Sequence, residues 1–459
     1  MQIIPFGAAG EVTGSAYLVT TTNARILIDF GLFQGEDDDV RNVVPQGLEP
    51  QNLDAVVITH GHLDHVGRLP LLLKNGLRGP IYGTPASLAI AELILADSAG
   101  IQQSDVDHAN RRRERAGLPL LKPLYDDNDV ARTIRRFKPL PYNQFVDVAP
   151  GISACMYEAG HILGSASISL RADDRSVVFS GDIGPHEVPY LRDPARITET
   201  VDLVVLESTY GNRDHRPRSE TLAEFTDVVS AAVHSGGKIL VPAFAIGRAQ
   251  EILYQLAAIF RSGAVQPFPV YLDSPLAIRA LEVYRRHPEL ADREAAALIR
   301  SGGWLDGIEQ LELCVSSNDS RAINDVRGPC LIIAGSGMCT GGRIVHHLRH
   351  NLWRRETVVL FVGYQAVGTP GRRIIDGAQY VRIFGDDIAV RARVATLGGF
   401  SAHAGRSELL AWLEPLAAAQ PRVVLTHGED TARAALADAI RSRYNINAEV
   451  PTFGEKIAL

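Results

Sequence analysis

The sequence of 459 residues is poor in cysteine, and its four cysteines lie far apart in the chain. Cys155, Cys314, Cys330 and Cys339 form no CxxC pair, which argues against a four-cysteine zinc site and against an iron–sulfur cluster. A disulfide framework is equally unexpected from such spacing. We interpret the cysteines as reduced core residues of a cytosolic protein.

The chain also lacks long apolar runs and a positive charge excess. No stretch approaches the roughly 20 apolar residues that span a bilayer, and the start of the chain shows no basic segment followed by an apolar one. We therefore expect a soluble, cytoplasmic protein without a signal peptide or a membrane partner. The net charge of −7 argues against a protein that coats nucleic acid non-specifically. It does not exclude a local binding groove, because bound metal and clustered arginines reverse the potential locally.

The length exceeds what one hydrophobic core usually supports, so we expect two domains. Strands that end in histidine or carboxylate residues occupy residues 1–208 and return from about residue 393. Between them, apolar strands alternate with amphipathic helices, which is typical of a parallel α/β sheet. We predict a first domain built from residues 1–208 and 393–459, with an α/β domain of residues 209–392 inserted into it.

The densest group of potential metal ligands follows the apolar run Ala55–Ile58. It comprises His60, His62, Asp64 and His65, and Gly61 would let the backbone turn tightly between them. Imidazole nitrogens together with a carboxylate suit zinc. A polar surface loop would not need clustered histidines at the end of a buried strand. The run is too rich in ligands for one ion, so partners are expected elsewhere.

Further candidates stand at other strand ends or in glycine-flanked turns, and they are Asp29, His161, Asp182, Glu207, His403 and His427. Ligand sites gather at strand ends because a rigid sheet fixes the loops there. Five histidines and two aspartates, at positions 60, 62, 64, 65, 161, 182 and 427, suffice for two Zn²⁺ ions about 3.5–4 Å apart. Two such ions suit the displacement of a phosphate ester by an activated water. Spacing alone does not say which ligand serves which ion.

The string His60-x-His62-x-Asp64-His65, with Asp29, His161 and Asp182, resembles the metallo-β-lactamase superfamily. Other pieces resemble its β-CASP nucleases, which include the cleavage and polyadenylation specificity factor endonuclease and ribonuclease J. These pieces are Glu207-Ser-Thr-Tyr-Gly211, Pro242 to Glu251, Gly335-Ser-Gly-Met338, Gly363 to Arg372, Ser401-Ala-His403 and Thr426-His427-Gly428. The resemblance spans nearly the whole chain. It implies an α/β fold, an αββα sandwich with an inserted parallel-sheet β-CASP domain.

The resemblance also implies roles for the candidate residues. His60, His62 and His161 would hold one zinc ion, and Asp64, His65 and His427 the other, with Asp182 bridging them. Asp29 would lie behind the ligands and orient one of them. His403 would be the general acid that protonates the leaving 3′ oxygen, with Glu207 as its hydrogen-bonded partner. The implied catalytic set is therefore His403, Glu207, Asp182 and Asp64.

Contacts to the substrate are expected from the inserted domain. The turn Gly335-Ser336-Gly337 follows a strand, and exposed backbone N–H groups in such turns bind anions. The candidate arginines are Arg248, Arg343, Arg372 and Arg373. For each arginine taken singly, an ordinary solvated role is the alternative. The charged run 111–115 is interpreted as a solvated helix face, with RNA contact as the less favoured interpretation.

Within the β-CASP group, a histidine at the position of His427 goes with members that act on RNA. The resemblance therefore implies a zinc ribonuclease that binds single-stranded RNA by its backbone, attacks with hydroxide activated by two metals, and leaves 5′-phosphate and 3′-hydroxyl ends. We favour an endonuclease over a 5′-to-3′ exonuclease. A DNA nuclease, a small-ester or thioester hydrolase, and a non-enzymatic RNA-binding scaffold are the competing hypotheses. Homodimers are common in this group, so a homodimer is a further expectation, although the sequence carries no interface signal.

Overall fold

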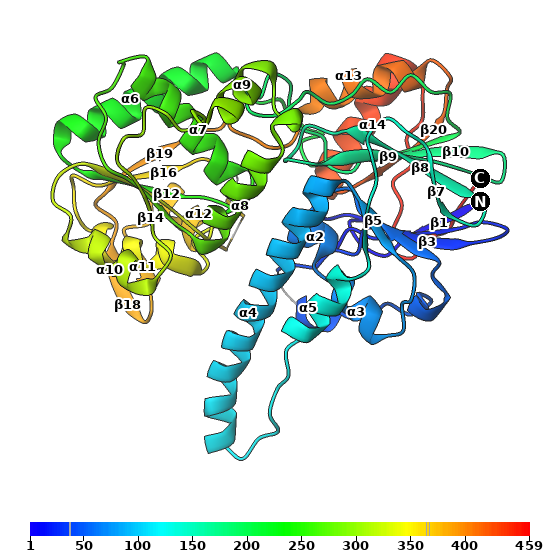
Figure 1. The fold of residues 1–459 in the computed structure, drawn as a ribbon, viewed down its shortest axis with the longest axis horizontal. Helices are drawn as coiled ribbons and strands as arrows, with labels where there is room; N and C mark the ends of the chain where they lie inside the picture. Colours follow the sequence, from blue (N-terminus) through cyan, green and yellow to red (C-terminus); the bar gives the residue numbers. More distant parts are fainter. Residues whose placement is uncertain (36–37, 364, 367) are drawn as a thin grey trace. The chain divides into compact units, whose positions relative to one another are not determined.

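A computed structural model describes residues 1–35, 38–363, 365–366 and 368–459, and the chain divides into two compact units (Figure 1). Unit 1 comprises Met1–Asp214 and His403–Leu459, and unit 2 comprises His215–Ala402. Unit 1 is therefore built from two segments that are separated in sequence by the whole of unit 2.

Unit 1 contains two sheets. The first has seven strands in the order β21 (Ile457–Ala458), β1 (Gln2–Pro5), β2 (Tyr17–Thr20), β3 (Arg25–Ile28), β4 (Ala55–Val57), β5 (Ile81–Gly83) and β6 (Phe137–Pro139). The second has six strands in the order β20 (Arg422–Thr426), β11 (Leu203–Glu207), β10 (Arg175–Phe179), β9 (Ala166–Ala172), β8 (Ile152–Glu158) and β7 (Val146–Ala149). Strands β3 to β6 run parallel, as do β10, β11 and β20.

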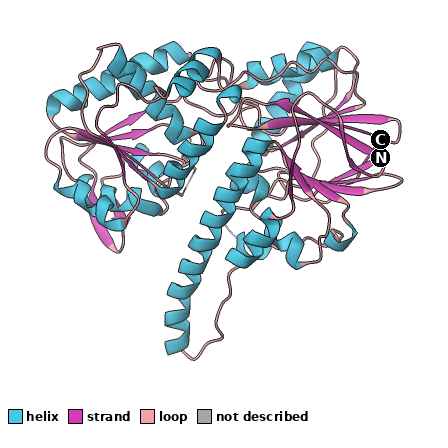
Figure 2. Cartoon of the chain, in the orientation of Figure 1, coloured by secondary structure: helices cyan, strands magenta, loops and turns pink. Residues whose placement is uncertain are grey.

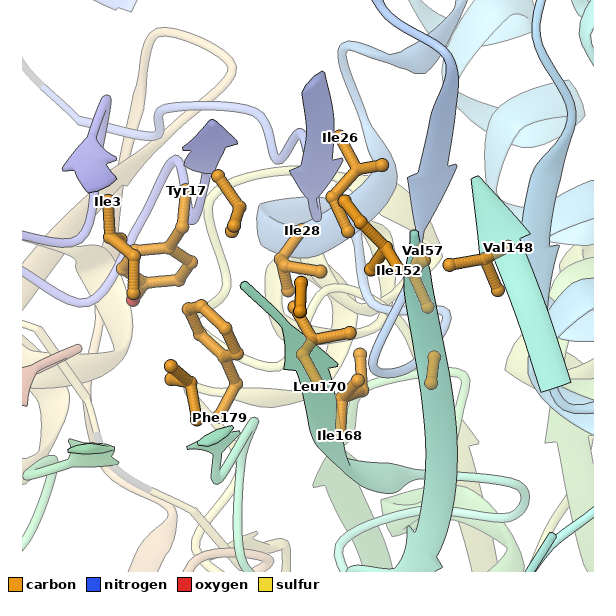
Figure 3. Close-up of a cluster of buried hydrophobic side chains, with 14 of the residues drawn as sticks. Ile3, Tyr17, Ile26, Ile28, Val57, Val148, Ile152, Ile168, Leu170 and Phe179 are labelled. Carbon is orange, nitrogen blue, oxygen red and sulfur yellow. The ribbon is translucent and has the colours of Figure 1, made fainter. Parts of the chain in front are cut away.

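The two sheets pack face to face over one apolar core, part of which is shown in Figure 3. Ile26 and Ile28 of β3 belong to this core, whereas Leu27 belongs to the cluster on the opposite face. The same alternation holds in β11, where Val205 faces the other sheet and Leu206 faces outward. Because successive side chains of a strand point to opposite faces, strands that are apolar at every position are buried on both sides.

Helices cover the outer faces of both sheets (Figure 2). The first sheet is covered by α2 (Leu63–Val66), α3 (Leu69–Lys74), α4 (Pro85–Arg115) and α5 (Asp127–Ile134), and the second by α13 (Arg406–Ala417) and α14 (Asp430–Tyr444). A short helix, α1, spans Asp38–Arg41. Unit 1 is thus a four-layer αββα sandwich, which confirms the fold expected from the resemblance.

Helix α4 is longer than the sequence pattern predicted. The sequence predicts a helix over residues 85–96, but the helix continues to Arg115 and extends beyond its neighbours in unit 1 (Figure 1). Its buried positions end at Ala99, so the second half has no apolar periodicity for a sequence pattern to detect. The charged run 111–115 forms its last turns. No helix in the described part of the chain, α4 included, is long and apolar enough to cross a membrane.

Unit 2 contains a sheet whose neighbouring strands are all parallel, as the alternation of strands and helices predicted. Its order is β14 (Leu311–Leu313), β13 (Val270–Asp273), β15 (Cys330–Ala334), β12 (Lys238–Pro242), β16 (Val358–Phe361) and β19 (Arg393–Thr396). Its helices are α6 (Arg218–Ser235), α7 (Arg248–Arg261), α8 (Pro275–Arg286), α9 (Arg293–Ser301), α10 (Ser317–Ala322), α11 (Gly342–Asn351) and α12 (Pro370–Ile375). Strands β17 (Tyr380–Ile383) and β18 (Asp386–Ala389) form a separate hairpin.

The position of β19 corrects one boundary of the sequence analysis. Residues from 393 onward were assigned to the first domain, but β19 pairs in parallel with β16 over all four of its residues. An unpaired edge of β16 would leave its backbone groups without partners, and β19 satisfies them. Unit 2 therefore extends to Ala402, and the chain re-enters unit 1 at His403.

Candidate metal centre and active site

The loop after β4 carries the densest group of candidate ligands. His60 follows the strand closely, His62 precedes the short helix α2, and Asp64 and His65 lie within it. Gly61 was expected to permit a tight turn, but its φ is not positive. Instead, a Cβ atom there would lie 2.6 Å from Cγ2 of Ile90 and 2.9 Å from the backbone nitrogen of Ala91. The glycine is needed because α4 packs against it.

A first group of donors contains His60, His62, His161 and Asp182, with one ligand atom of each within 4.8 Å of the others. Nδ1 of His62 lies 3.2 Å from Nε2 of His60 and 3.1 Å from Nε2 of His161. Oδ2 of Asp182 lies 3.5 Å from Nε2 of both His60 and His161. The loops after three separate strands, β4, β8 and β10, thus meet at one point.

A second group contains Asp64, His65, His427 and again Asp182. The Nε2 atoms of His65 and His427 are 3.3 Å apart, and Oδ2 of Asp64 lies 3.6 Å from Nε2 of His427. Oδ1 of Asp182 lies 3.3 Å from Nε2 of His65. His427 reaches the group because β20 pairs with β11 in a register that sets Thr426 beside Glu207.

The donors fit two divalent metal ions. Two ligands about 2.0–2.1 Å from one ion at a tetrahedral angle lie about 3.3 Å apart, which matches the nitrogen–nitrogen separations of 3.1–3.3 Å. Oδ1 of Asp182 is buried and accepts no hydrogen bond within the described chain. A buried carboxylate oxygen that accepts no hydrogen bond is costly, and a bound cation would offset this cost.

The protonation of His60 and His62 agrees with this use. Burial, together with the neighbouring His65, lowers the pKa of His60 well below its usual value, and burial lowers the pKa of His62 to about 4. Both rings are therefore neutral at pH 7 and carry a nitrogen lone pair, which is the form that binds metal. Burial also opposes a charged His65, but Asp182 and Asp29 outweigh it and raise the pKa of His65 well above its usual value. Burial opposes ionisation of Asp182, but His427, His65 and His60 outweigh it and hold the pKa of Asp182 well below its usual range.

Asp29 lies behind the second group. Its Oδ2 atom is 2.8 Å from Nδ1 of His65 and accepts a hydrogen bond of 2.8 Å from the Thr59 hydroxyl. Its Oδ1 atom accepts from the backbone N–H of Thr59 at 2.7 Å. The carboxylate is almost fully buried and directs Nε2 of His65 toward Asp182. This is the position in which a carboxylate orients a metal-binding histidine.

His403 and Glu207 form a pair beside the two groups. Nδ1 of His403 lies 3.2 Å from Oε1 of Glu207, and Oε1 also accepts from the backbone N–H of Ile183 at 2.8 Å. Burial disfavours a charged His403, but Glu207, with Asp182 and Asp64, overcomes this effect and raises the pKa of His403 to about 9. The imidazole therefore carries a donatable proton at neutral pH.

The structure also shows hydroxyl groups that the sequence analysis did not single out. Oγ1 of Thr59 lies 3.1 Å from Nδ1 of His60, and Oγ1 of Thr209 lies 3.1 Å from Nδ1 of His427. Oγ of Ser180 accepts from the backbone N–H of Glu207 at 2.9 Å. In the sequence, Thr59 and Thr209 could have been noticed only because they lie close to candidate residues at strand ends. Threonine is common at such positions without a functional role.

The residues predicted to bind substrate all lie in unit 2. The turn Gly335–Gly337 follows β15, as predicted, and Oγ of Ser336 accepts from the backbone N–H of Thr340 at 3.0 Å. Arg248 contacts Glu251, and Nε of Arg372 lies 2.9 Å from both carboxylate oxygens of Asp376. Arg373 is exposed. In the segment Gly363 to Arg372, residues 364 and 367 lie outside the described part of the chain.

The guanidinium of Arg343 is engaged within unit 2. Nη1 lies 2.6 Å from Oδ1 of Asp273 and 2.8 Å from the carbonyl oxygen of Cys314, and Nη2 lies 2.7 Å from that of Val315. Asp273 is fully buried at the end of β13 and also accepts from Nε2 of His347 at 2.7 Å and from Oγ of Ser320 at 2.6 Å. Asp273 thus connects β13 to helices α10 and α11.

We predict that Asp273→Asn destabilises unit 2 by about 3 kcal/mol, because the partly buried guanidinium of Arg343 loses its charge partner. Burial alone would raise the pKa of Asp273, but the hydrogen bonds from His347, Ser320 and Arg343 lower it. A carboxyl with a lowered pKa stabilises the fold above its unfolded pKa of about 4, and this stabilisation is lost as the pH falls through the folded value. Urea unfolding between pH 7 and pH 3 measures both effects.

The matched control for this variant is Asp376→Asn, which removes the exposed partner of Arg372. An exposed ion pair contributes little to stability, so the urea midpoint should hardly change. Equal midpoints for Asp273→Asn and the wild type would contradict the structural role of Asp273.

Comparisons with known proteins agree with this architecture. Residues 9–222 match the metallo-beta-lactamase superfamily, residues 249–374 the Beta-Casp domain, and residues 387–451 the Zn-dependent metallo-hydrolase RNA specificity domain. A Thermus thermophilus protein named Ribonuclease TTHA0252 is 40% identical over 458 residues, which cover 100% of both chains. A Methanosarcina mazei protein named Transcription termination factor FttA is 32% identical, and the match covers 100% of this chain and 72% of that one.

A solved structure of a protein of unknown function from Enterococcus faecalis is similar in fold. Its TM-score is 0.56 at 14% identity, with 100% of this chain and 99% of that chain covered. The likeness supports the fold alone, whereas the identity to the Thermus protein over the full length supports membership of the family. The chain therefore belongs to the metallo-beta-lactamase superfamily of metal-dependent hydrolases, as a member with an inserted Beta-Casp domain.

Proposed function

We propose that this hydrolase is a two-zinc ribonuclease that cuts phosphodiester bonds in single-stranded RNA and leaves 5′-phosphate and 3′-hydroxyl ends. The observation that carries the proposal is the sharing of Asp182 between two groups of metal donors, with the Glu207–His403 pair beside them. The name of the Thermus relative and the RNA specificity domain at residues 387–451 support RNA as the substrate.

Each candidate residue of unit 1 has a distinct task in this reaction. His60, His62 and His161 would hold one ion and Asp64, His65 and His427 the other, with Asp182 contributing one oxygen to each. Two bound zinc ions would lower the pKa of a water molecule and offset charge on the phosphate oxygens. Asp29 fixes the ring of His65, so that its Nε2 atom keeps a constant direction.

His403 supplies the proton that the leaving group needs. Water gives up a proton to solvent and its oxygen forms a bond to phosphorus. The bond from phosphorus to the 3′ oxygen breaks, and the 3′ oxygen takes its proton from Nε2 of His403. Glu207 contacts Nδ1 and so leaves the other ring nitrogen for this transfer. The carboxylate also stabilises the protonated imidazole before the proton is given up.

Metal removal gives the first test of the proposal. We expect EDTA to abolish hydrolysis of a labelled RNA oligonucleotide and Zn²⁺ to restore it, because the phosphate displacement depends on both ions. A panel of single-stranded RNA, single-stranded DNA of the same sequence, and carboxylic and thioester substrates would be compared. Preferential hydrolysis of DNA or of an ester would overturn the assignment of the substrate.

The chemistry of the product ends distinguishes water from the 2′-hydroxyl as nucleophile. We expect cleavage to continue when the nucleotide at the cut position lacks its 2′-hydroxyl. We also expect the 3′ product end to be a free hydroxyl that a poly(A) polymerase extends. A 2′,3′-cyclic phosphate end would contradict the proposed reaction. Circular RNA would be cut by an endonuclease, the mode that we favour, and would resist a 5′-to-3′ exonuclease.

A further inference from the structure

Thr209 contacts His427 at two points. It lies two residues beyond Glu207, in the loop after β11, and the parallel pairing of β11 with β20 brings it beside His427. Its Oγ1 atom is 3.1 Å from Nδ1 of His427 and donates a hydrogen bond to the backbone carbonyl of the same residue at 3.2 Å. One hydroxyl therefore contacts both the ring and the backbone of a candidate metal ligand.

The hydrogen bonds of Thr209 determine which ring nitrogen of His427 carries the proton. A threonine hydroxyl has one proton, and a carbonyl oxygen can only accept. The Thr209 hydroxyl uses its proton in the hydrogen bond to the carbonyl, so Oγ1 can only accept a hydrogen bond from Nδ1. Nδ1 must therefore carry the ring proton. The lone pair of the ring is then on Nε2, which lies 3.3 Å from Nε2 of His65 and 3.6 Å from Oδ2 of Asp64.

We propose that Thr209 is a positioning residue for the second metal ion, because it fixes the tautomer of His427 that presents Nε2 to that ion. The inference rests on the proposed two-metal function, in which His427 is a ligand. A second acceptor near Nδ1 is Oδ1 of Asp182, at 3.5 Å. That separation is longer than a typical N–H···O bond, and the oxygen is one that the metal ions would engage.

Thr209 is itself held in place. Its backbone N–H donates to Oε2 of Glu207 at 3.1 Å, and the N–H of Ser208 donates to the carbonyl of His427 at 3.1 Å. His427 has a φ of +48°, a backbone angle that residues other than glycine rarely adopt. The segment 207–209 thus contacts His403 through Glu207 and His427 through Thr209, and so aligns both histidines from one short stretch of chain.

The first metal group shows the same arrangement. The Thr59 hydroxyl donates to Oδ2 of Asp29 at 2.8 Å, and its Oγ1 atom lies 3.1 Å from Nδ1 of His60. The same proton count assigns the ring proton of His60 to Nδ1 and its lone pair to Nε2, which faces Asp182. Thr59 differs from Thr209 in that it contacts both groups, the first through His60 and the second through Asp29 and Nδ1 of His65, which lies 3.3 Å from its Oγ1 atom.

Zinc titration of the metal-free, full-length protein tests the role of Thr209, with a chromophoric chelator as competitor. Thr209→Val keeps the shape of the side chain and removes the hydroxyl. We expect one of the two zinc equivalents to bind about 10- to 100-fold more weakly, as is typical when a residue behind a ligand is lost. Thr209→Ser keeps the hydroxyl and should bind both equivalents within about threefold of the wild type.

Further variants separate this inference from the proposed function. His427→Ala should weaken the same equivalent, and Thr209→Val should add no effect in that background. Thr59→Val removes a hydroxyl that contacts both groups and should weaken both equivalents. Unchanged affinities in Thr209→Val beside a weakened His427→Ala would overturn the role of Thr209. Unchanged affinities in His427→Ala would instead overturn the assignment of that ligand. Should Thr209→Val unfold, Thr209→Ala serves in the same comparison.

Discussion

Asp182→Asn is expected to reduce kcat/KM for RNA by at least about a thousandfold, which corresponds to ~4 kcal/mol of lost transition-state stabilisation. Asp182 is the residue common to both donor groups, and its oxygens lie 3.3–3.5 Å from nitrogens of His60, His65 and His161. Asparagine has nearly the same shape, but it lacks the negative charge and replaces one oxygen by an NH₂ group. One ion would lose its ligand, and the other would keep only a neutral amide oxygen.

Metal content measured beside the rate makes this prediction specific. We expect Asp182→Asn to retain less zinc than the wild type after dialysis against a weak chelator. Asp202→Asn is a suitable control, because Asp202 lies just before the start of β11, contacts Arg175 and Ser176, and belongs to neither donor group. A variant of Asp182 that kept both ions and the wild-type rate would refute the two-metal arrangement.

His403→Ala is expected to lower kcat by about 10²- to 10⁴-fold, the usual contribution of a general acid. His403 is in neither of the two proposed ligand sets, so zinc content should stay close to that of the wild type. The ring lies 3.2 Å from Glu207 and packs near His161, with 4.5 Å between the ring centroids. Glu207→Gln, which leaves the imidazole in place but removes its charge partner, should cause a smaller fall.

A substrate with a different leaving group distinguishes acid catalysis by His403 from a structural role of this residue. A substrate with sulfur in place of the bridging 3′ oxygen releases a thiolate, whose conjugate acid has a pKa of about 8.5 and needs no proton in the transition state. We expect His403→Ala to cleave this substrate at a rate near that of the wild type. An equal loss on the oxygen and sulfur substrates would show that His403 does not act as the acid.

The sequence predicted the strands of the site well, because their apolar runs end close to the candidate ligands. Glu207 is the last residue of its strand, and Asp29, His60, Asp182 and His427 all lie within three residues after one. The sheets fix these positions, so a pattern that identifies the strand also locates the candidate site residue. The family resemblance then grouped residues whose separation in the chain gives no clue to their contact.

Other features depend on contacts that no local pattern records. The second half of α4 is largely exposed and has no apolar periodicity, so its helical state was not predicted. The partner of Arg343 is Asp273, and nothing near either residue in sequence indicates the pair. The role of Thr209 depends on its distance from a ring 218 positions away. Such pairings are set by the tertiary fold, which brings distant loops together.

The order of synthesis gives the split construction of unit 1 a further meaning. A ribosome makes the segment that carries His60 to Asp182 first, then the whole of unit 2, and only then His403 and His427. A nascent chain therefore lacks the proposed general acid and one candidate metal ligand until unit 2 has been translated. For the proposed ribonuclease, the delay means that the active site stays incomplete while the growing chain is still close to its own messenger RNA.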